Sequence, residues 1–320
     1  MSSTITLGHT DLEVFKLCLG GNVFGWTADE AQSFAVLDAY LAAGGNFIDT
    51  ADSYSAFAPG NVGGESETVL GRWMRARGNR DQIVLATKVG KKPGLEGLAP
   101  ATIRTALQES LERLGTDYID LYYAHADDEQ TPLEDSLEAL DALVKEGTVR
   151  YIAASNYTAP RLEAALQISQ RDGLAGYVAI QPQYSLVERT EYEGALADLS
   201  QSAGLACLPY WGLARGFLTG KYRAGAEVDS PRARAASHYQ TDAGYRLLDV
   251  VDEVAAHHQT TVAAVALAWL AAQPAVAAPL ASARTPEQLA EILPAAELEL
   301  SEAEISRLTD ATAQSAAGRG

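Results

Sequence analysis

Residues 82–155 read QIVLATKVGKKPGLEGLAPATIRTALQESLERLGTDYIDLYYAHADDEQTPLEDSLEALDALVKEGTVRYIAAS, and short apolar runs alternate with amphipathic segments along them. The apolar runs have the length and composition of buried strands; they are 82–88, 118–124 and 149–155. The segments between them, 100–114 and 133–146, have helical periodicity and end before a glycine, which commonly caps a helix. This stretch therefore predicts strands and helices in strict alternation.

The same alternation extends in both directions along the chain. Further strands are predicted at 16–20, 46–50, 177–181, 205–210 and 276–281. Further helices are predicted at 28–43, 66–77, 159–171, 192–203 and 243–273, and we expect the last of these to break near Gln259. Strands that alternate with helices form a parallel sheet with the helices outside it, and near-continuous apolar strands indicate burial on both faces.

Such a sheet closes in one of two ways, as an eight-stranded barrel or as an open doubly wound sheet. An open sheet that binds a dinucleotide usually carries a G-x-G-x-x-G turn after its first strand. Residues 20–25 read GGNVFG and have the wrong spacing. We therefore predict a single-domain (β/α)8 TIM barrel over residues 1–320, with a β-hairpin at 4–15 closing the barrel floor and a flexible tail at 311–320.

Composition disfavours several classes of protein. The net charge of −18 argues against a nucleic-acid partner, because phosphate binding needs a basic face. No apolar run reaches the ~20 residues that a membrane span needs, and residues 1–10 do not resemble a signal peptide. We therefore expect a cytoplasmic protein with no membrane association. The two cysteines, Cys18 and Cys207, lie in apolar runs and are predicted to be reduced core thiols.

Three charged or titratable side chains, Asp49, Lys88 and His125, stand at the ends of consecutive predicted strands, and Tyr54 follows in a loop. The active site of a TIM barrel lies at the C-terminal ends of its strands, so we expect these residues to share one pocket. We expect Lys88, paired with Asp49, to lower the pKa of Tyr54 and make it a general acid near neutral pH. His125 is expected to orient a carbonyl oxygen.

None of these side chains can supply a hydride, so a reduction at this site needs a bound cofactor. Amide side chains follow two later strands, at Asn156 and Gln181, and they suit a carboxamide partner. Tyr210, at the end of the seventh predicted strand, offers a flat face for stacking. The pattern therefore predicts a bound cofactor that supplies the hydride.

Short motifs occur in order along nearly the whole chain. They read NFIDTADSY (46–54), GESE (64–67), ATKVG (86–90), SLERLGTDYIDL (110–121), ASN (154–156), QPQYSL (181–186), GFLTGK (216–221) and RTPEQL (284–289). With these motifs the chain resembles the aldo-keto reductase family, in its longer bacterial and potassium-channel β-subunit-like branch. The resemblance implies the barrel and a catalytic tetrad of Asp49, Tyr54, Lys88 and His125.

The resemblance also implies that NADP(H) binds in extended form across the barrel mouth. The contacts implied for its nicotinamide end are Ser155, Asn156, Gln181 and Tyr210. The contacts implied for its 2′-phosphate end are Ser282, Arg284 and Gln288. Further contacts are expected from Gly21, Asn22, Asp49, Trp211, Gly212, Leu213, Ala214, Gly216, Lys221 and Arg232, with Arg234 as the alternative to Arg232. The guanidinium of Arg284 favours NADPH over NADH, because it matches the geometry of a phosphate.

The expected substrate is a small-molecule aldehyde or ketone, in a pocket with aromatic walls. The residues predicted to form those walls are Phe24, Trp26, Phe57 and Tyr123. No metal is predicted, because the adjacent residues His257 and His258 are expected to point to different faces of a helix.

Two other functions fit part of the same pattern. A buried lysine at a strand end, such as Lys88, can form a Schiff base with the substrate of an aldolase. The adjacent carboxylate of Asp49 opposes this role, because it favours the charged amine. The second alternative is an NADP(H)-binding, redox-sensing subunit that retains the tetrad but has little turnover.

Overall fold

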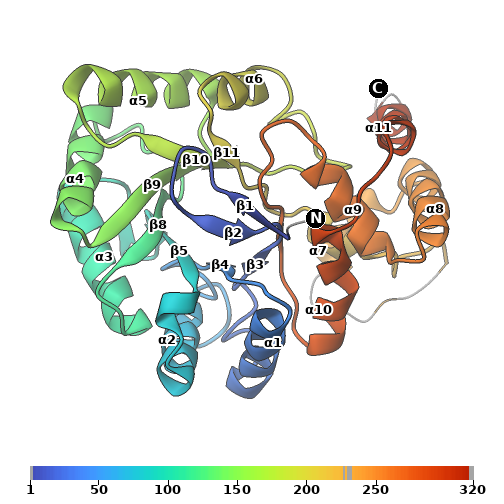
Figure 1. Ribbon diagram of the computed structural model, residues 1–320, viewed down its shortest axis with the longest axis horizontal. Helices are drawn as coiled ribbons and strands as arrows, with labels where there is room; N and C mark the ends of the chain where they lie inside the picture. Colours follow the sequence, from blue (N-terminus) through green and yellow to red (C-terminus); the bar gives the residue numbers. More distant parts are fainter. Residues whose placement is uncertain (1–2, 226–227, 229–232, 317–320) are drawn as a thin grey trace.

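An eight-stranded parallel sheet forms the centre of the protein. The structure is a computed structural model that describes residues 3–225, 228 and 233–316. The strands of the sheet are β3 (Cys18–Gly20), β4 (Phe47–Asp49), β5 (Val84–Val89), β8 (Ile119–Ala124), β9 (Val149–Ser155), β10 (Tyr177–Gln181), β11 (Ala206–Cys207) and β12 (Leu280–Ala281). They are ordered β11-β10-β9-β8-β5-β4-β3-β12. A parallel bridge between Cys207 and Val276 joins the two ends of this order, so the sheet closes into the predicted (β/α)8 barrel (Figure 1).

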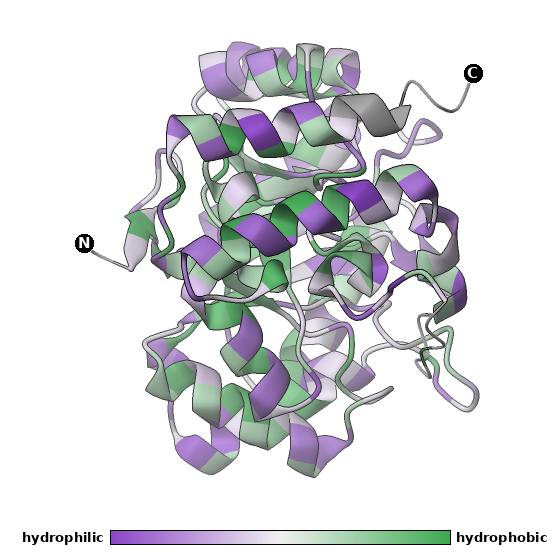
Figure 2. Ribbon diagram, turned by 90° about the vertical axis from the view of Figure 1, so that its right-hand side faces the viewer, coloured by the Kyte–Doolittle hydropathy of each residue, from purple (hydrophilic) through white to green (hydrophobic). Residues whose placement is uncertain are grey.

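Helices surround the barrel on its outside (Figure 1). They are α1 (Glu30–Ala42), α2 (Glu65–Arg77), α3 (Pro100–Leu114), α4 (Leu133–Glu146), α5 (Ala159–Asp172), α6 (Ala195–Ser202), α7 (Ala233–Ala236), α8 (Asp242–His257), α9 (Val262–Ala271), α10 (Pro286–Ile292) and α11 (Glu302–Ala316). Figure 2 shows hydrophilic and hydrophobic residues interspersed along the outer helices, as expected for helices with one buried face. In the described part of the chain, no helix is long and apolar enough to cross a membrane.

Side chains fill the barrel interior. Residues from successive strands form one buried cluster inside it: Cys18, Phe47, Ala86, Leu121, Tyr123, Ala153, Ala179 and Leu208. The antiparallel hairpin of β1 (Thr4–Thr6) and β2 (Glu13–Phe15) joins this cluster through Leu7, Leu12 and Val14. The hairpin therefore closes the barrel floor as predicted, and only the end where the strands terminate is left for a site.

The C-terminal segment differs from the prediction, because the expected tail at 311–320 is helical as far as Ala316. We expected a tail because residues 311–320 are small and polar. Tertiary contacts stabilise this helix. Leu308 is completely buried, and Arg189, in the loop after β10, donates to the Thr309 carbonyl at 3.0 Å and to Thr312 Oγ1 at 2.6 Å.

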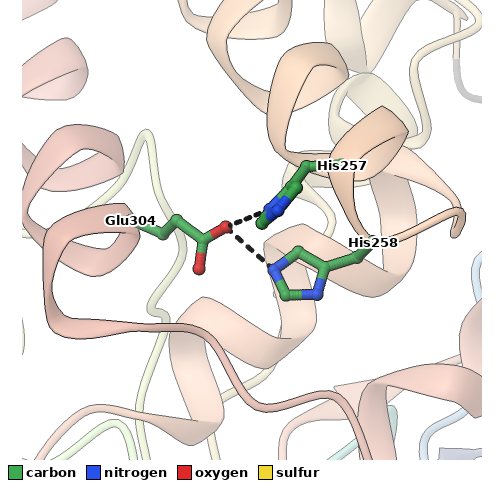
Figure 3. A group of neighbouring side chains, drawn as sticks. All are labelled: His257, His258 and Glu304. Carbon is green, nitrogen blue, oxygen red and sulfur yellow. Dashed lines mark hydrogen bonds and ion pairs between the residues drawn. The ribbon is translucent and has the colours of Figure 1, made fainter.

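The two adjacent histidines at the end of α8 converge, so our expectation that they point apart was wrong. His257 Nδ1 and His258 Nε2 lie 3.0 and 2.9 Å from the same oxygen, Oε1 of Glu304 (Figure 3). The expectation assumed a continuous helix, but α8 ends at His257, and Gln259 has a φ of +53°. The chain turns at this point, and both imidazoles face the first turn of α11.

Candidate active site

A buried cluster of ionisable side chains lies where β4 and β5 end. Asp49 is the last residue of β4, and Lys88 lies near the end of the adjacent parallel strand β5. Tyr54 stands in the loop after β4, which folds back through a series of turns. The Tyr54 hydroxyl donates to Asp49 Oδ2 at 2.9 Å and accepts from Lys88 Nζ at 2.9 Å. The structure thus places these three side chains in mutual contact.

Lys88 is completely buried and fully hydrogen-bonded. Its ammonium group donates to Asp49 Oδ2 at 2.5 Å, to the Thr50 carbonyl at 2.8 Å and to Tyr54 Oη at 2.9 Å, which uses all three of its N–H bonds. Burial lowers the pKa of Lys88, and the charge of Asp49 acts in the opposite direction. The ion pair with Asp49 favours the charged form of the amine.

The pKa of Tyr54 is shifted in the direction opposite to our expectation. Burial, followed by the negative charge of Asp49, raises it well above its usual value of about 10. We expected the ammonium group of Lys88 to dominate, but burial and the charge of Asp49 outweigh it. Tyr54 therefore stays protonated at neutral pH, which is the state that a proton donor requires.

His125 follows the last residue of β8 and lies beside Tyr54. The two ring centres are 6.1 Å apart, with the planes at 76°, and Ser53 Oγ lies 3.4 Å from His125 Nδ1. Burial lowers the pKa of His125 well below its usual 6.5, and the positive charges of Lys88 and Lys91 add to this effect. The imidazole is therefore neutral at neutral pH and can orient a carbonyl oxygen by hydrogen bonding.

A second buried charged cluster lies close by, and we did not predict it from the sequence. Glu67, on α2, accepts hydrogen bonds from Thr87 Oγ1 at 2.5 Å and from Arg113 Nε at 2.7 Å. Asp52 is completely buried, and neither of its carboxylate oxygens has a hydrogen-bond partner among the described residues. Burial, followed by the charge of Glu67, raises the pKa of Asp52 to about 7. Glu67 and Arg113 are 46 residues apart, so no local pattern indicates their pairing.

A cavity of about 880 Å³ opens at the C-terminal end of the barrel strands, within the range of ~300–1,000 Å³ that is typical of small-molecule sites. Tyr54 and His125 line it. Trp26 and Phe57 line it as well, with their rings packed edge to face and 4.8 Å apart. Most of the predicted cofactor contacts also line it, namely Asn22, Asp49, Ser155, Asn156, Gln181, Tyr210, Trp211, Gly212, Leu213, Gly216, Lys221, Ser282, Arg284 and Gln288.

Five predicted residues within the described chain do not line the cavity, and one of them, Lys88, is the completely buried partner of Asp49 and Tyr54. Phe24 packs between the sheet and the helices, and Tyr123 lies inside the barrel in the layer below the mouth; both are completely buried. We had taken a position near a strand end as a sign of exposure, whereas the layers of side chains in a barrel cover such residues. Gly21 and Ala214 are also buried behind the lining. Arg232 lies outside the described residues.

The amide side chains at the cavity are hydrogen-bonded to other protein groups. Gln181 Nε2 donates to Asp49 Oδ1 at 3.0 Å. Asn156 Nδ2 donates to the His125 carbonyl at 2.8 Å, and Asn156 Oδ1 accepts from Tyr210 Oη at 2.7 Å. These bonds fix the orientation of both amides and of the Tyr210 ring. A carboxamide that binds here has to share these bonds or replace them.

Four cations of the described residues line the same cavity; Lys91 was missing from our predicted contacts, and so was Arg215. Its guanidinium packs over the Trp211 ring at 3.9 Å, and its buried Nε has no hydrogen-bond partner among the described residues. Trp211, Ala214 and Arg215 all have positive φ, a strained conformation that tends to occur at functional sites. The other two cations are Lys221 and Arg284. Arg215 could have been identified from the sequence, because it is a basic residue within the segment between Trp211 and Lys221 that we expected to bind the cofactor.

The closed barrel, with polar and charged side chains gathered at the C-terminal ends of its strands, has the architecture of a TIM-barrel enzyme. The sequence model of the Aldo/keto reductase family matches residues 16–313, and the chain belongs to this family. Membership of this family supports an oxidoreductase that acts on carbonyl groups. The resemblance inferred from the motifs is thereby confirmed.

Relatives of known sequence cover nearly the whole chain. It is 35% identical over 322 residues to protein tas of Escherichia coli (strain K12), covering 92% of this chain and 93% of that protein. It is 32% identical over 317 residues to norsolorinic acid reductase stcV of Emericella nidulans, covering 93% of this chain and 78% of that protein. It is also 31% identical over 297 residues to a probable voltage-gated potassium channel subunit beta of Oryza sativa subsp. japonica, covering 89% of this chain and 88% of that protein.

Proposed function

We propose that the protein reduces an aldehyde or ketone to an alcohol, with NADPH as the hydride donor. The observation that carries this proposal is the environment of the Tyr54 hydroxyl. It lines the cavity, is hydrogen-bonded to both Lys88 and Asp49, and lies beside the neutral imidazole of His125. A protonated phenol next to a fixed cation is suited to donate a proton to a developing alkoxide.

In this mechanism the proton comes from Tyr54. A carbonyl oxygen within hydrogen-bond reach of Tyr54 Oη and the His125 imidazole is oriented and polarised by both groups. When bound, NADPH supplies a hydride to the carbonyl carbon. As Tyr54 gives its proton to the carbonyl oxygen, Lys88 Nζ, 2.9 Å away, stabilises the phenolate that remains. Asp49 keeps Lys88 charged and in place.

The cavity has side chains that fit a phosphorylated dinucleotide. Arg215, Lys221 and Arg284 supply positive charge for phosphate groups. The buried Nε of Arg215 lacks a partner among the described residues, and a phosphate oxygen satisfies such a donor. Asn156 supplies an amide for a carboxamide, and the Tyr210 ring, held by its hydrogen bond to Asn156, supplies a stacking face.

The test of this function is the oxidation of NADPH in the presence of a panel of aldehydes, ketones and quinones. We expect turnover with at least one aromatic carbonyl compound, because Trp26 and Phe57 form an aromatic wall of the cavity. Protein and NADPH without a carbonyl compound provide the control. Tight NADPH binding without turnover on any compound would contradict the proposal.

Tight NADPH binding without turnover would favour the alternative function, an NADP(H)-binding sensor. The observation in its favour is the similarity to a probable potassium channel subunit beta. A sensor also needs a cofactor site, so NADPH binding does not separate the two functions, whereas the turnover rate does.

A Schiff-base aldolase is disfavoured by the hydrogen bonds of Lys88. Its amine is completely buried and donates all three protons to protein acceptors. A nucleophilic amine must be neutral and accessible. We therefore expect borohydride to trap no carbonyl substrate on Lys88, and detection of such an adduct by mass spectrometry would revive the aldolase function.

Replacing Arg284 by alanine is expected to weaken the binding of NADPH more than that of NADH. A hydrogen bond to a charged group contributes ~1.5–3 kcal/mol, so we expect NADPH affinity to fall roughly 10- to 100-fold. Glu291 also lines this cavity, and its negative charge repels a phosphate. The difference between the losses of NADPH and NADH affinity therefore tests whether the 2′-phosphate lies beside Arg284. Both dissociation constants can be measured by fluorescence titration. Equal losses for the two cofactors would place the 2′-phosphate elsewhere.

A further inference from the structure

A group of metal-binding side chains lies outside the cavity, between α8 and α11 (Figure 3). His257 is the last residue of α8, His258 follows it, and Glu304 lies in the first turn of α11. One ligand atom from each residue lies within 4.8 Å of the other two. None of the three residues lines the cavity of the candidate active site.

The carboxylate of Glu304 is held in position by the start of its own helix. The Ser301 backbone N–H and hydroxyl donate to Glu304 Oε2 at 2.8 and 2.7 Å, and the Glu304 N–H donates back to Ser301 Oγ at 3.3 Å. This arrangement is a capping box. Oε2 is thus engaged within the helix, and Oε1 faces the two imidazoles.

Two imidazole nitrogens and one carboxylate oxygen suit zinc, whereas magnesium and calcium prefer oxygen ligands alone. Zinc binds such atoms at about 2.0–2.2 Å in tetrahedral geometry, which places neighbouring ligands roughly 3.3 Å apart. The two histidine nitrogens lie 3.0 and 2.9 Å from Glu304 Oε1. The side chain of His257 is 74% exposed, so an ion has access from solvent, and this side chain is free to adjust.

We propose that His257, His258 and Glu304 bind a zinc ion that links the end of α8 to the start of α11, with water as the fourth ligand. At the end of α8 the two consecutive imidazoles converge on one point, Oε1 of Glu304. A metal link at the first turn of α11 fixes the start of this helix against the end of α8. The role is structural, because the site lies away from the cavity.

The test is a zinc titration of the full chain after treatment with a chelator, followed by calorimetry and by thermal unfolding. We expect one zinc ion to bind per chain. At a ~100-fold excess of zinc over its dissociation constant, we expect the midpoint of unfolding to rise by about 5 °C. Cobalt in place of zinc is expected to give the intense visible absorption of a four-coordinate site.

The matched variant is Glu304→Gln, because glutamine preserves the capping box with Ser301 but removes the anionic ligand. We expect it to bind zinc at least about 10-fold more weakly, and His257→Gln to do the same. The control is His238→Gln, which changes a histidine outside the group and is expected to leave zinc binding unchanged. NADPH binding is expected to be unchanged in all three variants. Failure to bind one zinc ion per chain, or equal affinity in Glu304→Gln and the unaltered protein, would overturn the proposal.

Discussion

Replacing Tyr54 by phenylalanine is expected to lower kcat/KM for carbonyl reduction by about 10²- to 10⁴-fold, the range typical of general acid catalysis. The substitution removes only the hydroxyl that donates to Asp49 and accepts from Lys88. Lys88 keeps its bonds to Asp49 and the Thr50 carbonyl, so the buried ion pair persists. Because the ring remains, the shape of the cavity and the affinity for NADPH are expected to be retained.

The measurement pairs steady-state kinetics on a good carbonyl substrate with a fluorescence titration of NADPH. Tyr245→Phe is the matched control, because Tyr245 lies on α8 and does not line the cavity. We expect that control to have the kinetics of the unaltered protein. If Tyr54→Phe reduced the substrate at nearly the original rate, the proton would have to come from another group, and His125 would be the next candidate. Loss of NADPH binding in the variant would instead show that the ring has a role in cofactor binding.

The fold was readable from the sequence because a barrel repeats one local pattern. Residues 82–155 contain the barrel strands β5, β8 and β9 and the helices α3 and α4, each within a residue or two of its predicted bounds. The two-residue strands β6 (Lys91–Lys92) and β7 (Leu95–Glu96) were not predicted. The prediction failed at helix α11, because residues 311–320 are small and polar and were expected to form a tail. Contacts with Arg189 and the burial of Leu308 define that helix. Such long-range contacts have no signature in a single sequence.

The polar residues of the site were readable for a related reason. Parallel strands all end at the same edge of the barrel, so sequence position after a strand was enough to bring Asp49, Lys88 and His125 together. The pKa shifts at the site could not be predicted from sequence position. The raised pKa of Tyr54 depends on its burial and on the charge of Asp49. Asp52 shows the same limit, because its burial beside Glu67 becomes apparent only in three dimensions.

Replacing Asp52 by asparagine is expected to raise the free energy of unfolding at pH 8, by at most roughly 4 kcal/mol, and to leave it nearly unchanged at pH 4. The pKa of Asp52 is about 7 in the folded protein, against 3.8 for an ordinary aspartate. Each pKa unit of difference corresponds to ~1.4 kcal/mol. The folded chain therefore binds this proton more tightly than the unfolded chain does, and stability falls as pH rises from about 4 to 7.

The protonation state of the Asp52 carboxyl group explains why the substitution stabilises the protein at high pH. Below pH 4 it is protonated in both the folded and the unfolded chain, and asparagine is a close neutral substitute. Above pH 7 it is ionised, although it is buried beside Glu67 without a hydrogen-bond partner among the described residues. Urea unfolding of both proteins between pH 4 and pH 8 measures the difference between their free energies of unfolding. The other carboxylates are the same in both proteins, so their contributions cancel in this difference. A pH-independent difference would mean that Asp52 has an ordinary pKa in the folded protein, and that a buried water molecule or cation compensates its charge.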